Sequence, residues 1–108
     1  MSALLKKNFD YIRLLVVTKS RKQLKALAAT ITPEQTKTIV EIVHNALHLQ
    51  IPISKTDRLG LVKHRAFLET LVDRKKSLKS KSSSIKQKLS TVIFLLKAVL
   101  PGLKALLQ

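Results

Sequence analysis

Residues 32–47 read TPEQTKTIVEIVHNAL and carry the strongest structural signal in the chain. Thr32 suits the N-cap of a helix, Pro33 suits the first helical position because its missing N–H would have no partner there, and Gln35 completes a capping box. The apolar residues that follow repeat at helical spacing: Ile39, Ile42, Val43, Ala46 and Leu47. The stretch therefore predicts an amphipathic helix that buries one face against neighbouring elements.

The segments on both sides of this stretch also have helical patterns. Ser20 and Gln23 have capping-box spacing for one helix start, Ser54 begins another, and Pro52 between them implies an extended connection. Three further apolar faces comprise Leu5, Phe9, Ile12 and Val16, then Leu24, Leu27 and Ala28, and then Leu61, Leu68, Leu71 and Val72. With no run strong enough to build a sheet, we expect an all-α protein, a small bundle of four to five helices.

The composition excludes several classes of function. The chain has 108 residues, 45% of them hydrophobic, with no cysteine and two glycines. It therefore lacks a disulfide framework, a thiolate metal site and a cysteine nucleophile, and Gly60 and Gly102 stand alone rather than in a phosphate-binding glycine loop. Lys and Arg number 21 against 6 Asp and Glu, which gives a formal net charge of +15. Such a surplus points to a polyanionic partner.

The positive charge is unevenly divided along the chain. Residues 74–108 hold 9 basic and no acidic side chains, and 7 of these cations fall within the 15 residues 74–88, where serines fill most of the gaps. We interpret residues 1–72 as a helical body, residues 73–88 as a basic hinge and residues 89–108 as an apolar C-terminal helical segment.

The basic hinge is the feature that indicates function. A run of cations without anions repels itself unless a polyanion neutralises it, and each phosphate contact releases a counterion. No pattern typical of base recognition is present, so we expect binding without sequence choice. The expected contacts are Arg74, Lys75, Lys76, Lys79, Lys81, Lys86 and Lys88, extended by Lys63 and Arg65. The alternative is a solvated run or a nuclear-import signal.

The sequence offers little for catalysis or for metal binding. His44 and His48 are four residues apart and share a helix face with Glu41, a spacing that can hold zinc, but the same positions form the solvated face of an amphipathic helix. The carboxylates are scattered, and no nucleophile stands beside a base in a recognisable motif. We therefore expect no enzyme activity, no catalytic residue, no metal site and no cofactor.

The apolar C-terminal segment allows two interpretations. As a last core helix or a self-association helix it needs no further partner. If residues 79–104 were one helix, Lys79, Lys86, Lys97 and Lys104 would lie within about 20° of one another, giving a lysine stripe suited to lying on a bilayer surface. Pro101 and Gly102 should kink or end that helix, and the lysines make it a poor membrane span.

Several short motifs occur in a familiar order. They are SRKQLKAL (20–27), TPEQ (32–35), IVEIVHNAL (39–47), IPIS (51–54), KHR (63–65) and LVDRKKSLK (71–79). Together with the Leu-rich tail, they resemble the small basic proteins of Polinton/Maverick elements and adintoviruses, which are similar to the adenovirus minor core protein (core protein ten, the mu precursor).

This resemblance implies a protein of the virion core that condenses double-stranded DNA, present in the host nucleus during assembly. Two departures from the family pattern favour an interaction role instead: the tail begins LSTVIFLL (89–96) rather than with a Gly-Gly-Phe-Leu-Pro-like entry, and serines dilute the hinge. The basic hinge and the resemblance together lead us to predict a non-enzymatic DNA-packaging protein. The alternative is a membrane-active or scaffolding protein acting through the Lys-striped C-terminal helix.

Overall fold

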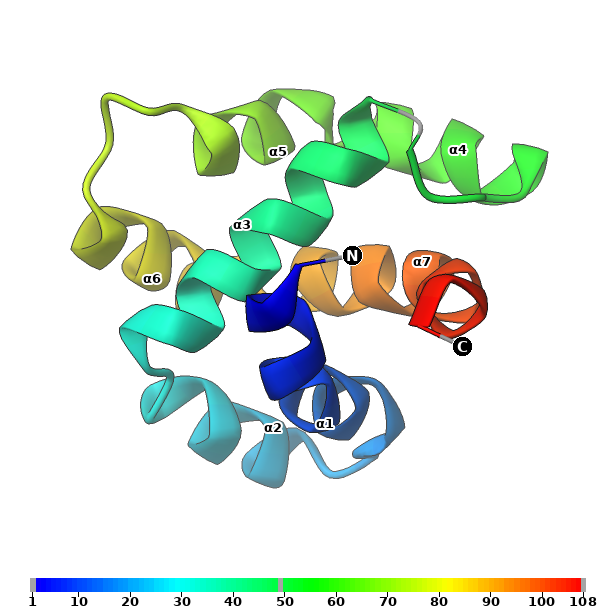
Figure 1. Cartoon of the computed structure of the whole chain (residues 1–108). Helices are drawn as coiled ribbons and strands as arrows, with labels where there is room; N and C mark the ends of the chain where they lie inside the picture. The colour runs from blue at the N-terminus through cyan, green and yellow to red at the C-terminus, as the bar shows by residue number, and fades with distance from the viewer. Residues whose placement is uncertain (1, 49, 108) are drawn as a thin grey trace.

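The computed structural model describes residues 2–48 and 50–107, with side chains described as far as residue 105, and this part of the chain is all-helical (Figure 1). The all-α class is therefore confirmed. The described residues form seven helices, so the expected count of four to five was too low. The helices are α1 (Ala3–Val17), α2 (Arg21–Ala29), α3 (Pro33–Leu47), α4 (Lys55–Val62), α5 (Arg65–Val72), α6 (Leu78–Gln87) and α7 (Leu89–Leu107).

Helix α3 runs diagonally through the molecule and contacts α1, α5, α6 and α7 (Figure 1). Its predicted capping box is present: the Gln35 backbone N–H donates to Thr32 Oγ1 at 3.1 Å, and the Thr32 N–H donates to Gln35 Oε1 at 2.9 Å. The apolar positions predicted for this helix, Ile39, Ile42 and Val43 among them, lie in the core. The sequence pattern at 32–47 thus identifies the helix against which α1, α5, α6 and α7 pack.

One extra helix arises because the segment after Ser54 is two helices rather than one. Ser54 caps α4 as expected, with the Asp57 N–H donating to its Oγ at 3.1 Å. Helix α4, which lies wholly within the described residues, has no buried residue, whereas α5 buries Leu68 and Leu71. The turn between them, where the His64 N–H donates to the Leu61 carbonyl at 3.0 Å, gives α5 its own direction against α3.

Residues 73–88 contain a turn followed by helix α6. Ser77 caps this helix by accepting from the Ser80 N–H at 3.1 Å, and Ile85 on its inner face joins the hydrophobic core. The helix packs against α2, α3, α5 and α7. The residues that we interpreted as a hinge therefore include an element with its own place in the core.

Helix α7 continues through Pro101, where we expected a kink or an end. Gly102 is buried against the extended segment after α3: a Cβ there would lie 2.8 Å from the Pro52 carbonyl oxygen. The core contains Val92, Ile93, Leu95, Leu96, Val99 and Leu103 of this helix. The helix therefore does not end at Pro101, although this residue cannot donate a backbone hydrogen bond.

Helices α6 and α7 meet at Lys88, whose φ of −113° and ψ of 39° lie outside helical geometry. The four lysines of the expected stripe are consequently divided between two helices. In the part of the chain that the structure describes, no helix combines the length and the apolar character needed to cross a membrane.

Candidate nucleic-acid interface

The turn between α5 and α6 presents the first group of predicted cations. The Lys75 N–H donates to Asp73 Oδ1 at 2.9 Å and the Lys76 N–H donates to the Asp73 carbonyl at 3.2 Å, so one carboxylate residue shapes the turn. Arg74, Lys75 and Lys76 are exposed, as is Lys79 on the first turn of α6. Their ammonium and guanidinium groups are therefore free to meet an external anion.

Lys81 differs from the other predicted contacts. Lys81 is buried on the inner side of α6, and only 8% of its surface is exposed. Among the described residues no buried side-chain nitrogen or oxygen lacks a hydrogen bond, so the covered part of Lys81 is its aliphatic stem. Lys81, which was predicted as a phosphate contact because it belongs to the cationic run, therefore mainly contributes to packing.

Lys63 and Arg65 lie at the turn between α4 and α5 and are exposed. The Arg65 guanidinium pairs with Glu69 one turn later, with 2.9 Å between Nε and Oε1. This pair offsets part of the positive charge at the turn, so the extension of the basic surface toward α4 is weaker than the sequence indicated.

The structure brings Lys86 and Lys88 into a cleft that the sequence did not reveal. The cleft has a volume of about 700 Å³ and lies between α2 and the junction of α6 with α7, and we call it the α2–α7 cleft. Its cationic residues are Lys19, Arg21, Lys25, Lys86, Lys88 and Lys97. The cationic run at residues 19–25 was the available signal for its α2 side, but our sequence analysis did not include these residues among the expected phosphate contacts.

Local helix geometry builds this cleft. Ser20 caps α2 by accepting from the Gln23 N–H at 3.3 Å, which fixes where Arg21 and Lys25 lie on the helix. The break at Lys88 turns the chain from α6 into α7, and α2 packs against α6. Apolar side chains also line the cleft, namely Leu24, Leu89, Ile93 and Phe94, together with the polar Gln87, Ser90 and Thr91.

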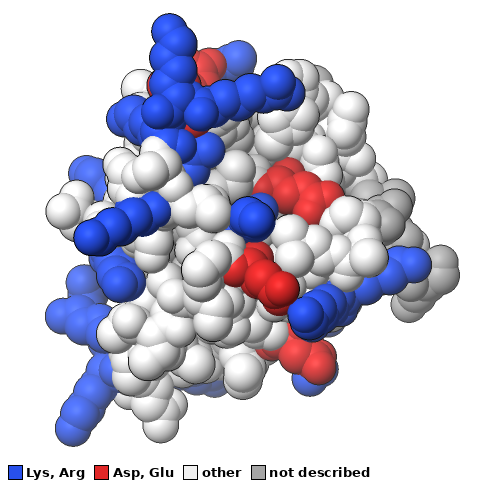
Figure 2. All heavy atoms as spheres, turned by 60° about the vertical axis from the view of Figure 1, so that its left-hand side comes forward, with Lys and Arg blue, Asp and Glu red and all other residues white. Residues whose placement is uncertain are grey.

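The charge of the cleft is uncompensated within the described structure. None of the described residues that line it is acidic. Figure 2 shows Lys and Arg side chains along the left edge without Asp or Glu beside them, whereas at the top, the centre and the lower right basic and acidic side chains lie together. Because like charges held together repel, an anion bound here would relieve that repulsion.

The histidines and Tyr11 have structural surroundings. His44 and His48 stack with 4.3 Å between ring centroids, and His48 Nδ1 lies 2.8 Å from the His44 carbonyl oxygen. Ser2 Oγ donates to Glu41 at 2.7 Å, and the described residues contain no group of three or more side chains able to hold a metal ion. The Tyr11 hydroxyl donates to the Leu27 carbonyl at 3.1 Å, and burial raises the pKa of Tyr11 to about 12.

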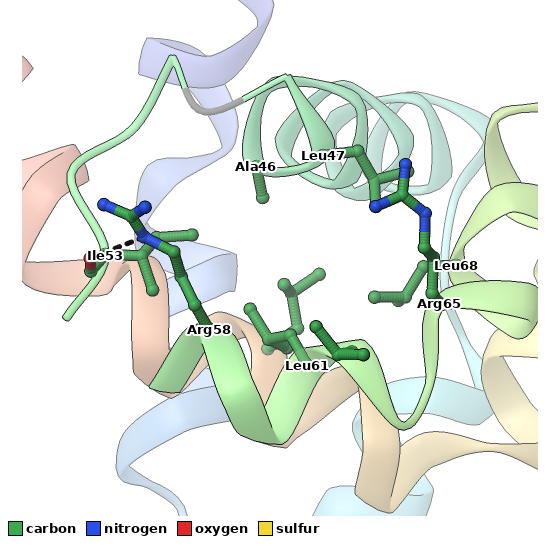
Figure 3. A pocket seen from close by; sticks show the side chains of 9 residues that line it. Ala46, Leu47, Ile53, Arg58, Leu61, Arg65 and Leu68 are labelled. Carbon is green, nitrogen blue, oxygen red and sulfur yellow. Dashed lines mark hydrogen bonds between the residues drawn. The ribbon is translucent and has the colours of Figure 1, made fainter. Parts of the chain in front are cut away.

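A second, smaller cleft of about 220 Å³ lies beside α4 and is mainly apolar (Figure 3). Ala46 and Leu47 of α3 line one side and Leu61 of α4 the other, with Arg58 and Arg65 at opposite ends. Arg58 Nε donates to the Ile53 carbonyl at 3.3 Å. The described lining contains neither a carboxylate nor a histidine, so it offers no acid–base pair.

Comparison with known proteins adds no relative: no family model, no curated protein and no solved structure matches this chain.

Proposed function

We propose that this protein is a non-enzymatic, sequence-independent nucleic-acid-binding protein that compacts or packages double-stranded DNA. The observation that carries the proposal is the grouping of exposed cations on the α5–α6 turn, on α6 and around the α2–α7 cleft, without an acidic residue in the described cleft lining. Phosphate groups at regular spacing are the anions that such a surface fits, because each contact also releases a condensed counterion.

Of the seven cations predicted within residues 74–88, six have the exposure that phosphate contact requires: Arg74, Lys75, Lys76, Lys79, Lys86 and Lys88. If all six engage duplex DNA, the slope of log affinity against log salt is about −5. No feature of the surface supports reading of base edges, since the cations are long, flexible and mostly lysine, which meets phosphate as a point charge.

The resemblance to Polinton/Maverick and adenovirus core proteins supports a more specific role. In that role the protein belongs to a virion core and accompanies a viral or mobile-element genome, with assembly in the host nucleus. A compact, strongly basic helical protein meets the physical requirement of that role, which is to neutralise closely packed DNA.

The alternative membrane-active or scaffolding role meets a physical obstacle. The apolar side chains of α7 through which it would act are occupied in the core. Insertion into a bilayer would require this helix to leave α1 and α3, with the loss of its share of the buried apolar surface that stabilises the fold.

A mobility-shift titration tests the proposed function. The full-length chain should retard two duplexes of equal length and unrelated sequence with equal affinity in dilute buffer. A strong preference for one sequence would contradict the absence of base readout, and failure to retard either duplex would contradict nucleic-acid binding. Flotation with neutral liposomes, run in parallel, should leave the protein in the unbound fraction.

A further inference from the structure

We propose that the α2–α7 cleft binds a single-stranded segment of nucleic acid, with phosphates on its cationic rim and an unpaired base against Phe94. This inference rests on the proposed function and adds single-stranded nucleic acid as a second ligand. The cleft differs from the outer surface of α6 because it is concave and combines positive charge with an apolar lining.

The size of the cleft favours an unpaired nucleotide over a duplex. Its volume of about 700 Å³ lies within the roughly 300–1,000 Å³ of sites that enclose small organic ligands. A duplex is too wide to enter such a space, and its bases are stacked inside the helix. Only its phosphates could reach the rim, which would leave the apolar lining without a partner. An unpaired nucleotide supplies both a phosphate and an apolar base face.

Phe94 is the residue that could receive that base. It is the aromatic residue of the cleft lining and keeps 38% of its surface exposed, whereas most of the large apolar side chains described on α7 are buried. Aromatic side chains in positively charged grooves bind single strands by stacking, which works with any base. From the sequence, Phe94 belongs to the apolar C-terminal segment, so its place in the cleft is a finding of the structure.

Phe94 is also held in place. A Cβ at Gly60 would lie 2.7 Å from Phe94 Cζ, so the ring tip sits close to the α4 backbone at the one position where no side chain stands in its way. The His64 ring meets it edge-on, with 6.3 Å between centroids and 61° between planes. A ring that is already fixed loses little freedom when a base stacks on it.

The cationic rim can follow a strand on both sides of this ring. Lys97 lies on α7 three residues after Phe94, while Arg21 and Lys25 approach from α2 and Lys86 and Lys88 from the α6 end. Gln87, Ser90 and Thr91 supply hydrogen-bonding groups for sugar or base atoms. The described lining therefore contains each group that a non-specific single-strand site requires.

Fluorescence anisotropy with two labelled probes tests this inference: an oligo-dT strand, which cannot pair with itself, and a duplex with the same number of phosphates. Phe94→Leu keeps an apolar side chain but removes the ring. It should weaken oligo-dT binding by about 5- to 100-fold, the loss of one stacked base, and change duplex binding by less than about twofold. Equal effects on both probes, or no effect on oligo-dT, would overturn the inference.

A matched pair of lysines on α7 provides a second measurement that does not depend on Phe94. Lys97→Gln should weaken oligo-dT binding more than duplex binding, while Lys104→Gln, which removes the same charge from an exposed residue outside the cleft lining, should affect both probes alike. If the two variants behave identically, the cleft is not the strand site.

The outcomes separate this inference from the proposed function. If the wild-type chain binds the duplex and the cleft variants leave oligo-dT binding unchanged, the single-strand site is wrong and duplex binding stands. If the wild-type chain binds neither probe in dilute buffer, both proposals are wrong.

Discussion

Removing charge from the α5–α6 turn should reduce the salt dependence of DNA binding by a predictable amount. We consider the quadruple variant Arg74→Gln, Lys75→Gln, Lys76→Gln and Lys79→Gln. All four side chains are exposed, so the variant changes surface charge and leaves the core intact. With six phosphate contacts in the wild-type chain, duplex affinity should fall roughly 10³-fold between about 50 mM and about 200 mM salt.

The variant keeps two of those six contacts, Lys86 and Lys88. Its slope should fall from about −5 to about −2, so the same change in salt should weaken binding by roughly 10-fold. The assay is fluorescence anisotropy of a labelled duplex titrated at four or five salt concentrations.

The matched control removes four exposed cations that lie neither in residues 74–88 nor in the lining of the α2–α7 cleft: Lys6→Gln, Lys22→Gln, Lys37→Gln and Lys55→Gln. It has the same net charge as the test variant, so a smaller effect on the slope locates the contacts. Equal slopes for the two variants would refute the reasoning, because binding would then depend on net charge alone. Truncation at Val72 is a poor substitute, since it removes Ile85 and Leu96 from the core.

Three further predictions concern residues whose surroundings are specific to this fold. Lys81→Met should leave duplex affinity within about twofold and should not lower the urea midpoint, because the buried part of Lys81 is its stem; a loss of affinity like that of an exposed lysine would contradict this. Tyr11 has a pKa raised from 10.0 to about 12 by burial. The unfolded chain therefore loses this proton first, and the free energy of unfolding should fall by up to about 2 kcal/mol as pH rises from about 10 to 12. Tyr11→Phe should flatten that part of the urea-denaturation profile, and a slope equal to wild type would exclude Tyr11 as its cause. Gly102→Ala should destabilise the protein by about 1–3 kcal/mol in thermal or urea unfolding, because the new Cβ meets the Pro52 backbone; a stabilised variant would show that the helix–loop contact is loose.

The helix starts were predictable because capping is local. Thr32 with Gln35, Ser20 with Gln23, and Ser54 with Asp57 each form their bonds within three residues, so the pattern in the sequence contains the whole interaction. The core face of α3 was predictable for a similar reason, because helical spacing alone places its apolar residues on one side.

The extra helices and the course of α7 depend on distant contacts. The break after α4 reflects how α5 packs on α3, and α7 passes Pro101 because Gly102 lies against Pro52, some fifty residues earlier in the chain. Local propensity favours an end of the helix near Pro101, and tertiary packing allows the helix to continue past it.

The candidate site was likewise predictable from the sequence only in part. Exposed cations at 74–79 followed from the linear charge run, but the burial of Lys81 required the position of α6 on the core. The cleft required α2 to lie beside the α6–α7 junction, so the joining of Lys19, Arg21 and Lys25 with Lys86 and Lys88 could not be read from spacing along the chain.

The location of the phosphate contacts is the central claim, and an NMR titration of the isotope-labelled full-length chain with a short duplex tests it most directly. We predict that the backbone amides of residues 74–80 and 86–88 shift most, and that the shifts reverse when salt is added. Shifts confined to α4, around the exposed Leu59 and Val62, or no shifts in dilute buffer, would contradict the account.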